Sequence, residues 1–584
     1  MTDAAAEVHG SVAIPEAHHR VEPTSQSRID EALAVLEDHK HEWVALDIDE
    51  RLHLLAELSE ATVKVARDWV DAACQAKGLT LGASEEAEEW LGGPGSVTRN
   101  IKLLMTSLED IRDYGVPQLP KPAFARADGQ VVAQVIPANA WDGLLFQGFT
   151  AEVWMDPSVT LGALSEHQAA FYKQKSPKGA LALVLGAGNV ASIGPMDALY
   201  KLFVEGQVVV LKMNPVNEYL GPFIDESFAA LIERGYLRVV YGGAAEGDYL
   251  CNHPLVEEIH ITGSDKTHDA IVYGVGEEGA RRKADNAPRN NRRLTCELGN
   301  VSPIVVVPGP WSKKDLKFQG VNLATTVVNN AGFNCVATRV IVQHEQWAQR
   351  EALLDSLRQA FRDAGDRKPY YPGSEERQRT FLEHHPDAEQ IGSQGEGHVP
   401  WTLIHHLDPD DTDEVCFNME SWCGQTSEVA LPAASVVEYI DRAVEFCNER
   451  VWGTLSASII VHPSSLKDPE VNEAVERAIA NLRYGSVAVN HWGGINYAMV
   501  TPTWGAYPGH PTTDIRSGRG VVHNTFMFDR PQKSVLRGPF RMWPKPAWFI
   551  DNKRGAEIAE KMTYFNADPS LVRLPGLLWA SFGG

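Results

Sequence analysis

Two stretches of the sequence place reactive side chains where a covalent reaction can use them. Residues 329–342 read NNAGFNCVATRVIV, which puts Cys335 on a glycine-containing turn and not inside an apolar run. Residues 294–307 read LTCELGNVSPIVVV, with Glu297 just ahead of a strand-like segment. A cysteine on such a turn is favoured as a reactive thiol over a buried apolar residue. Oxidation of an aldehyde through a covalent intermediate needs such a nucleophile, a base for water, oxyanion donors and a hydride acceptor.

A third stretch contains a glycine pattern known from dinucleotide-binding turns. Residues 181–195 read LALVLGAGNVASIGP, in which Gly186, Gly188 and Ala191 give G-x-G-x-x-A. A turn of that kind is normally followed by an acidic residue at the end of the next strand, where it binds ribose hydroxyls. The next strand here, VVVLK, ends in Lys212. The pattern is therefore a weak sign of a pyrophosphate loop, and Asn189 and Lys212 need another explanation.

The elements that must position these residues alternate along the chain. Between residues 181 and 273, four apolar runs, LALVL, VVVLK, LRVVYG and EEIHITG, each precede a segment of helical length. This alternation predicts a parallel sheet with crossover helices. A second series, SPIVVV, RVIVQ, SASIIVH and GSVAVN, follows between residues 302 and 490. We therefore predict an α/β fold with two Rossmann-like parallel-sheet domains.

Segments outside these two series are predicted from their composition. Helices are expected over residues 29–36, 50–76 and 83–108, where apolar residues recur at helical spacing. Residues 1–27 are polar and expected to form a flexible segment. Residues 367–413 are rich in turn formers and are interpreted as an insert, and the tail after residue 524 is rich in proline and aromatic residues.

The composition excludes several classes of function. The 584 residues include 77 acidic and 53 basic ones, a net charge of −24, so we expect no nucleic-acid partner. No apolar run reaches the roughly 18 residues of a membrane span, and the first residues lack the features of a secretory signal. The seven scattered cysteines include no C-x-x-C pair, which predicts reduced thiols and no metal site. We expect a cytoplasmic protein.

Read together, the motifs resemble those of the aldehyde dehydrogenase superfamily. The family's Glu-Leu-Gly followed by Ser-Pro appears as ELGNVSP over residues 297–303, and its cysteine turn appears as NAGFNC over residues 330–335. The strand ending in Lys212 and the element Gly263-Ser264 occur in the family's order. The likeness covers residues 180–340 by motif and extends to about residue 515 by its sheet pattern.

The resemblance implies a role for each of these residues. Cys335 would attack the aldehyde, Glu297 would activate water, and Asn189 would stabilise the oxyanion together with the backbone N–H of Cys335. The product would be a carboxylic acid, formed through a thiohemiacetal and a thioester of the cysteine. The implied cofactor is NAD or NADP, and the residues expected to bind it are Lys212, Gly263, Ser264, Glu420 and Leu298.

Departures from the family pattern leave alternatives open. Phe333 replaces the usual glutamine, and Pro215 stands where a ribose-binding glutamate is common, so the sequence does not distinguish NAD from NADP. One alternative is a relative that passes the acyl group to CoA, although the presence of Glu297 favours hydrolysis. Another is a scaffold that keeps the fold without catalysis. The aromatic residues of loop 491–511 either line a pocket for a bulky aldehyde or pack a long loop.

The resemblance also implies how the chain is divided. Residues 28–135 and 180–295 would form the cofactor-binding domain, and residues 296–515 the catalytic domain. Residues 136–179 and 516–584 would form a β-strand oligomerisation arm and a C-terminal extension. Strands of such an arm seek a partner, so we expect a homodimer or homotetramer.

Overall fold

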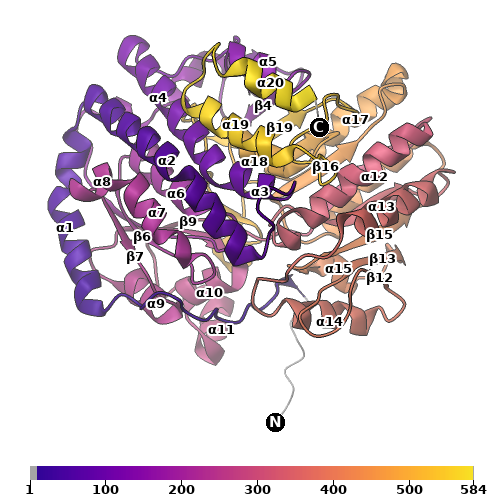
Figure 1. Ribbon diagram of the computed structural model, residues 1–584, viewed down its shortest axis with the longest axis horizontal. Coiled ribbons are helices and arrows are strands. Elements are labelled where there is room, and N and C mark those ends of the chain that lie inside the picture. The colour runs from indigo at the N-terminus through magenta and orange to yellow at the C-terminus, as the bar shows by residue number, and fades with distance from the viewer. Residues whose placement is uncertain (1–8, 583–584) are drawn as a thin grey trace.

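The alternating apolar runs fold into two sheets that are covered by helices, which confirms the predicted α/β class (Figure 1). The computed structural model describes residues 9–582. The first sheet has the strand order β18-β9-β8-β5-β6-β7. Its strands are β5 (Leu181–Leu185), β6 (Val208–Lys212), β7 (Leu237–Val240), β8 (Glu258–Gly263), β9 (Arg293–Leu298) and β18 (Gly518–Arg519). All neighbours are parallel except β18, which pairs antiparallel with β9 beside Glu297.

The second sheet has eleven strands in the order β12-β13-β15-β11-β10-β16-β17-β19-β4-β3-β2. The run from β13 to β19 is parallel, and antiparallel strands extend it at both ends. The strands are β2 (Phe124–Ala125), β3 (Val131–Ile136), β4 (Thr150–Met155), β10 (Ser302–Val306), β11 (Thr338–His344), β12 (Glu389–Ile391), β13 (Trp401–Leu407), β15 (Gln425–Leu431), β16 (Ser456–Ile460), β17 (Ser486–Val489) and β19 (Pro531–Arg537). The eight apolar runs named above are all strands of one sheet or the other.

Alternate side chains of β10 explain why the second sheet is covered on both faces. Ile304 and Val306 pack with residues of α12 (Lys313–Val328) and α13 (Arg350–Ala364). Val305 packs with residues of α16 (Val436–Glu449) and α17 (Pro469–Asn481) on the opposite face. Successive side chains of a strand point to opposite faces, so a strand that is apolar throughout needs a helix layer on each.

The helices predicted ahead of the first sheet are present. They are α1 (Gln26–Ala45), α2 (Ile48–Lys77), α3 (Glu86–Trp90) and α4 (Ser96–Tyr114). Asp47 caps α2, accepting a hydrogen bond from the Glu50 N–H at 2.8 Å while Glu50 bonds back to the Asp47 N–H. The crossover helices of this sheet are α6 (Ile193–Leu199), α7 (Gly221–Ser227), α8 (Ala229–Glu233), α9 (Ala244–Asn252), α10 (Asp265–Tyr273) and α11 (Gly276–Ala284).

The strands expected to form an arm are paired within the chain. β4 pairs antiparallel with β19, with Val153 opposite Ser534, and β3 continues the sheet beyond β4. β19 in turn lies parallel to β17. Early and late parts of the same chain thus satisfy each other's backbone hydrogen bonds, while the oligomerisation arm and the homodimer or homotetramer stay predictions. The connection between β3 and β4 contains α5 (Ala140–Leu145).

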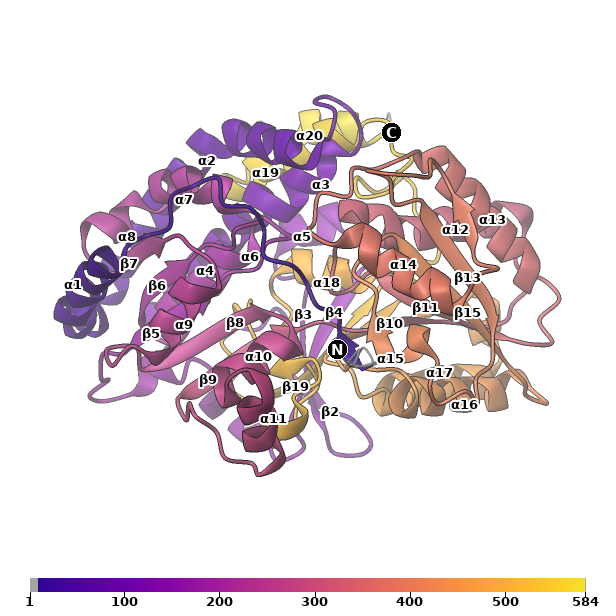
Figure 2. The same cartoon turned by 90° about the horizontal axis from the view of Figure 1, so that it is seen from below.

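The segment expected to be flexible follows a fixed path from residue 9 onward, whereas residues 1–8 lie outside the described part of the chain. We call the part built around the first sheet the first lobe and the part built around the second sheet the second lobe. β1 (Gly10–Ser11) pairs in parallel with β14 (Met419–Glu420), so the segment runs from the first lobe to the second (indigo in Figure 2). The Ser11 N–H donates to Asp265 Oδ1 at 3.0 Å. Backbone hydrogen bonds hold this stretch, and composition does not reveal such bonds.

Residues 367–413 also carry more structure than a turn-rich insert. They contain α14 (Ser374–His384), β12 and β13, and β13 lies parallel to β15 inside the sheet. The run WTLIHHL of β13 includes two histidines, which weakens the apolar signal of a buried strand. The short helices α15 (Val415–Asn418) and α18 (Gly493–Met499) complete this lobe.

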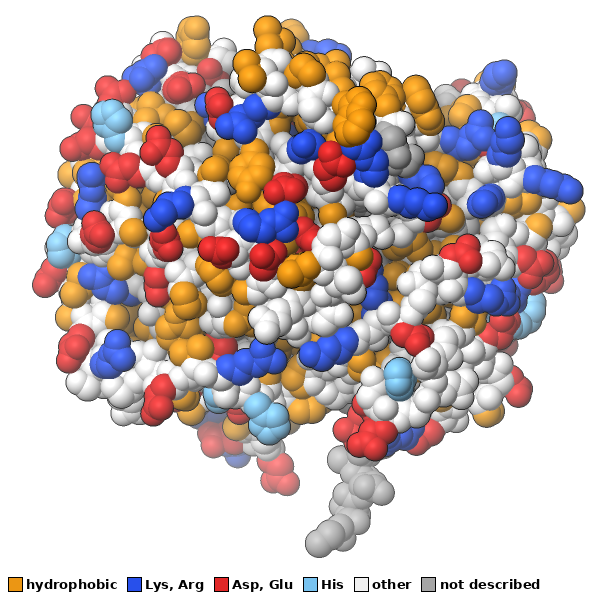
Figure 3. Space-filling view, in the orientation of Figure 1, with side chains coloured by type: hydrophobic (Ala, Val, Ile, Leu, Met, Phe, Trp, Pro, Cys, Tyr) orange, Lys and Arg blue, Asp and Glu red, His pale blue; other side chains and the backbone are white. Residues whose placement is uncertain are grey.

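The C-terminal extension ends in α19 (Gly555–Ala567) and α20 (Leu574–Phe582), drawn in yellow in Figure 1. α19 packs against α3 and α4, and α20 packs against α19. Leu577 and Ala580 of α20 are buried, whereas Trp579 is 70% exposed. Hydrophobic side chains gather on the surface over these two helices (Figure 3). Within residues 9–582, no helix has both the length and the apolar character to cross a membrane.

Candidate active site

The loop that carries Cys335 is held in an unfavourable backbone conformation. Asn330, Ala331 and Gly332 have φ angles of 53°, 54° and 84°, so three successive residues lie in the left-handed region. A Cβ on Gly332 would lie 2.6 Å from the carbonyl oxygen of Cys423. Arg339, which is buried, donates at 2.6 Å to the carbonyl oxygens of both Gly332 and Cys423. These contacts fix the loop and with it the position of the thiol.

Phe333 occupies the position at which the family pattern has glutamine. Its ring packs against Tyr370 and Tyr371, with centroid distances of 5.0 and 5.4 Å. Both tyrosines belong to the segment expected to be an insert, so that segment supports the nucleophile loop. The substitution is therefore explained by packing on the side of the loop that faces this segment.

Glu297 reaches the thiol from the end of β9. Burial raises the pKa of Glu297 to about 8, and contacts with the Cys335 thiol and the Trp504 indole only partly oppose this shift. Burial, together with the carboxyl groups of Glu297 and Glu420, raises the pKa of the Cys335 thiol well above its ordinary value. Both groups are therefore mainly protonated at neutral pH, and the carboxyl group stands where it can take up the thiol proton.

Two cavities meet at Cys335. The sheet-edge cavity, about 830 Å³, lies along the ends of β5, β6 and β8 and has Glu297 and Cys335 on its wall. The extension cavity, about 700 Å³, begins at Cys335 and runs toward α19 and α20. Both fall in the range of roughly 300–1,000 Å³ typical of small-molecule sites. One ligand can therefore approach the thiol from each side.

The sheet-edge cavity brings together most of the residues expected to bind a cofactor. Lys212, Gly263, Ser264 and Glu420 line it. Oε1 of Glu420 is buried without a hydrogen-bond partner, and burial raises the pKa of this carboxyl group to about 8. Burial lowers the pKa of Lys212 to about 8. Lys212 Nζ donates to the carbonyl oxygen of Met213 at 3.4 Å and has further donors to offer. A ribose hydroxyl group would supply the partner that Glu420 Oε1 lacks, so the residues present fit a nicotinamide dinucleotide.

Leu298 is the exception among the expected cofactor residues. Its side chain is fully buried in the core of the first lobe, and it does not line the sheet-edge cavity. Its N–H donates to the carbonyl oxygen of Ser517 at 2.9 Å. Ser517 immediately precedes the late strand β18, which sequence reasoning did not predict.

Asn189 lies beside the nucleophile loop, where the resemblance places an oxyanion donor. Its Nδ2 donates to the carbonyl oxygen of Phe333 at 2.9 Å. The backbone carbonyl oxygen of Asn189 accepts hydrogen bonds from Lys77 Nζ at 3.0 Å and from Asn330 Nδ2 at 2.9 Å. Lys77 also forms a buried ion pair with Glu89 at 2.8 Å. This network couples the loop after β5 to the loop of Cys335.

Lys77 and Glu89 were missed by sequence reasoning. They lie on helices whose charges, spaced between apolar residues, are typical of a solvated helix face. No local motif marks Lys77, because its partners Asn189 and Asn330 are more than 100 residues away in the chain.

The glycine pattern after β5 has a packing explanation. A Cβ on Gly188 would lie 2.6 Å from Asn214 Oδ1 and 2.8 Å from Cβ of Val216. Gly188 therefore allows the loop after β5 to approach the loop after β6. The glycine is required by this close contact, which needs no bound phosphate.

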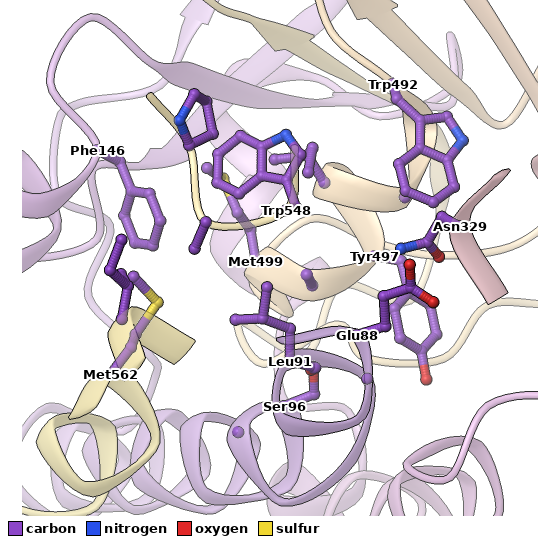
Figure 4. A pocket seen from close by; sticks show the side chains of 18 of the residues that line it. Glu88, Leu91, Ser96, Phe146, Asn329, Trp492, Tyr497, Met499, Trp548 and Met562 are labelled. Carbon is purple, nitrogen blue, oxygen red and sulfur yellow. The ribbon is translucent and has the colours of Figure 1, made fainter. Parts of the chain in front are cut away.

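The extension cavity is polar near the thiol and apolar at its far end. Figure 4 shows Glu88, Asn329, Trp492 and Tyr497 at one end of it, and Phe146 and Met562 at the other. Leu91, Met499 and Trp548 lie between them. Of the loop 491–511, Trp492, Tyr497 and Trp504 line this cavity, so the interpretation of the loop as part of a pocket is supported.

Comparison with known proteins agrees with this geometry. A profile of the Aldehyde dehydrogenase family matches residues 149–369, which include Asn189, Lys212, Glu297 and Cys335. N-succinylglutamate 5-semialdehyde dehydrogenase of Sphingopyxis alaskensis is 27% identical over 199 residues, 34% of this chain and 37% of that protein. Residues 149–369 of this chain therefore belong to the aldehyde dehydrogenase superfamily.

A second curated member of the superfamily gives a similar match. 4-Trimethylaminobutyraldehyde dehydrogenase of Homo sapiens is 29% identical over 181 residues, 30% of this chain and 32% of that protein. The aligned stretches thus span little more than a third of the length of these relatives at most.

Solved structures of superfamily members share the fold over most of the chain. A putative aldehyde dehydrogenase from Burkholderia cenocepacia has 16% identity and a TM-score of 0.59, covering 88% of this chain and 93% of that one. An NAD-dependent aldehyde dehydrogenase from Sinorhizobium meliloti has 17% identity and a TM-score of 0.57, covering 92% of each chain. GapN from Methanocaldococcus jannaschii, solved with NADP, has 13% identity and a TM-score of 0.57, covering 89% of this chain and 96% of that one.

One trio of potential metal ligands exists within residues 9–582 of this chain. His385, Glu414 and Cys416 have ligand atoms within 4.8 Å of one another. Glu414 Oε1 accepts from the Cys416 N–H at 2.8 Å, which caps α15, and lies 2.9 Å from His385 Nε2. A helix cap and an ion pair account for the arrangement.

Proposed function

We propose that the protein oxidises an aldehyde to a carboxylic acid, with NAD or NADP as hydride acceptor and Cys335 as nucleophile. The observation that carries this proposal is that the Cys335 thiol and the Glu297 carboxyl group share the wall of one cavity, at its junction with a second cavity. One cavity has the buried, unpartnered groups that a dinucleotide would satisfy, and the other is suited to an aldehyde.

The chain's own residues supply the steps as follows. Glu297 takes the proton of the Cys335 thiol, and the thiolate adds to the aldehyde carbon to form a thiohemiacetal. The second N–H of the Asn189 amide and the backbone N–H of Cys335 would stabilise the oxyanion. A nicotinamide bound in the sheet-edge cavity supplies the hydride acceptor. Loss of hydride from the thiohemiacetal carbon leaves a thioester on Cys335. Glu297, after releasing the thiol proton to solvent, removes a proton from the water that hydrolyses this thioester.

Four residues would hold the cofactor. Glu420 and Lys212 would accept from and donate to ribose hydroxyl groups, while Gly263 and Ser264 would face the pyrophosphate at the N-terminus of α10. Ser264 already caps this helix, accepting from the Thr267 N–H at 3.1 Å.

Transfer of the acyl group to CoA is the competing reaction. A transferring enzyme has to protect its thioester from water, whereas here a buried carboxyl group stands beside the thiol. Glu297 therefore supports hydrolysis. A scaffold without chemistry would have no need for a loop of three left-handed residues that presents a thiol.

The test measures reduced nicotinamide with a panel of aldehydes, with NAD or NADP, and with or without CoA. We expect turnover without CoA that is lost in Cys335→Ala and kept in Cys447→Ala, since Cys447 is a buried cysteine of α16 outside both cavities. Turnover only with CoA, or equal turnover in Cys335→Ala, would overturn the proposal.

A further inference from the structure

The extension cavity has a polar end and a long apolar end. Its apolar wall comes from several separate parts of the chain, among them Leu91 before α4, Met499 of α18 and Met562 of α19 (Figure 4). The end at Cys335 carries Asn329, Asn330 and Glu88. A ligand that matches this wall has one polar group, placed at the thiol, and an extended apolar body.

Charged side chains on the wall are already paired. Lys77 bonds to Glu89, Glu88 accepts from Arg367 at 2.7 Å, and Arg99 binds Asp142 in two hydrogen bonds at 2.8 and 3.0 Å. A charged substrate would therefore lose its hydration without gaining a free counter-ion.

The size of the cavity exceeds what a small aldehyde fills. At about 700 Å³ it would leave most of the apolar wall without contact around a ligand of two or three carbons. Methionine side chains such as Met499 and Met562 adapt to flexible chains, because they are unbranched and polarisable.

The cavity also has exposed apolar side chains on its wall, along with Arg541 and Lys545, which pair with Asp315 and Asp551. Trp543 and Phe582 both line it, and they are 81% and 56% exposed. Their rings lie 5.4 Å apart, so two aromatic side chains from the C-terminal extension flank the entrance. Large exposed apolar groups of this kind mark sites that meet apolar ligands (Figure 3).

We propose that the extension cavity binds the hydrocarbon chain of a long, unbranched aliphatic aldehyde, with its carbonyl group at Cys335. This substrate class rests on the proposed function, since it assigns the reacting end of the ligand to the thiol. The C-terminal extension, which lies outside the motifs, is then the specificity element.

The first test is a series of linear aldehydes from four to fourteen carbons. Each buried methylene contributes about 0.8 kcal/mol, so kcat/KM should rise about fourfold per carbon until the cavity is filled. A four-carbon aldehyde that is turned over as well as a twelve-carbon one, or a preference for aromatic or charged aldehydes, would overturn the inference while leaving the proposed function intact.

Two variants locate the effect in the cavity. Met562→Glu places a charge on the apolar wall and should lower kcat/KM for the twelve-carbon aldehyde by at least about tenfold, with much less effect on the four-carbon one. Lys561→Glu, on the same helix, serves as the matched control and should change neither. Equal losses with both aldehydes in Met562→Glu would refute the assignment.

A binding measurement keeps the inference testable without turnover. Dodecanal, which is uncharged, should bind the inactive Cys335→Ala protein, as measured by calorimetry, and should bind Met562→Glu/Cys335→Ala at least about tenfold more weakly. Dodecanal binding without any aldehyde turnover would refute the proposed function alone, and absence of binding would refute the substrate class.

A second, independent observation concerns the choice between NAD and NADP. Glu16, in the segment that crosses the sheet-edge cavity, accepts from the Ala244 N–H at 2.9 Å. Glu246 accepts from the Gly243 N–H at 2.8 Å. The first N–H groups of α9 are thus already bonded to carboxylates of the chain itself.

These carboxylates lie close to Lys212 at the end of β6, and both act on its charge. In parallel sheets that bind dinucleotides, the adenosine ribose lies at the end of the strand next to the first, and an acidic residue there accepts from its 2′-hydroxyl. A 2′-phosphate at this position would meet the carboxylates of Glu16 and Glu246 beside Lys212, and the N–H groups of Gly243 and Ala244 are already bonded.

We infer that Glu16 selects NAD over NADP by accepting a hydrogen bond from the 2′-hydroxyl and repelling a 2′-phosphate. Binding of NADH and NADPH to the protein without aldehyde, followed by fluorescence, tests this. NADH should bind at least about tenfold more tightly, and Glu16→Gln should reduce this ratio. Glu22→Gln, an exposed position of the same segment, should leave the ratio unchanged. Tighter binding of NADPH, or a ratio unaffected by Glu16→Gln, would overturn the inference.

Discussion

The ionisation of Glu297 should set the pH at which Cys335 becomes a nucleophile. The pKa of the thiol lies well above its ordinary value, and that of Glu297 is about 8. Only the ionised carboxylate accepts a proton, so activity should be present above a pH of about 8 and be lost as the pH falls through it. Glu297→Gln keeps the size of the side chain and removes the base.

The size of the effect follows from the pKa. With a pKa of about 8, Glu297 is about 9% ionised at pH 7 and about 91% ionised at pH 9, so kcat/KM for the aldehyde should rise about tenfold. A glutamate of ordinary pKa would be fully ionised over this range and would give a flat profile. In Glu297→Gln we expect a loss of about 10²–10⁴ in kcat/KM, with activity rising only where the thiol ionises by itself.

The assay follows reduced nicotinamide at saturating cofactor from about pH 6 to about pH 9.5. Alkylation of Cys335 by iodoacetamide, measured in parallel without substrate, reports the thiolate directly. Glu277→Gln, on the surface helix α11, is the matched control and should behave as the wild type. A flat wild-type profile, or a Glu297→Gln profile that still rises through about pH 8, would refute the role of Glu297 as base.

Three further variants test the supports of the site. Lys77→Met leaves the buried Glu89 unpaired and should lower the free energy of unfolding by about 3–5 kcal/mol. The loss should be seen as a lower melting temperature, and replacing Glu89 by Leu as well should recover part of it. Gly188→Ala should lower both stability and turnover, because its Cβ meets Asn214, and an unchanged melting temperature would contradict that clash. Glu420→Gln should stabilise the cofactor-free protein by a few kcal/mol at high pH. The pKa of the Glu420 carboxyl group is raised to about 8 in the folded protein. The gain in stability should therefore appear above the pKa of the unfolded state and be complete by about pH 8 in thermal unfolding. A gain in stability confined to acid pH would contradict this prediction.

Much of the framework could be predicted from the sequence, because local apolar patterns determine it. All the strand runs of both parallel series are present, since a strand buried on two faces must be apolar along its whole length. Glu297 and Lys212 were expected in the site because they stand at the ends of strands, whereas Cys335 lies on a turn before β11 and was assigned by the resemblance.

What could not be predicted depends on contacts between distant segments. Glu16 lies in a polar stretch whose order comes from backbone hydrogen bonds, and Lys77 lies on a helix that otherwise has a solvated pattern. The strand β4 finds its partner in β19 of the same chain, which no local signal distinguishes from a partner in a second chain. For Leu298, the local signal was present, since its place in a motif suggested a ligand contact. Its side chain lies in the core, and its backbone N–H bonds to Ser517.

The pairing of β4 with β19 has a consequence for how the chain folds. β4 ends at residue 155, and its partner β19 begins at residue 531. In the other sheet, β9 pairs with β18, which is formed by residues 518–519. During synthesis both sheets therefore present an open edge until nearly the whole chain has left the ribosome. Pairings of such long sequence separation form slowly and expose strand edges to aggregation in the meantime. Folding of either lobe should thus be completed only after translation of the last segments, and chaperones would act on an intermediate whose β4 and β9 edges are unpaired.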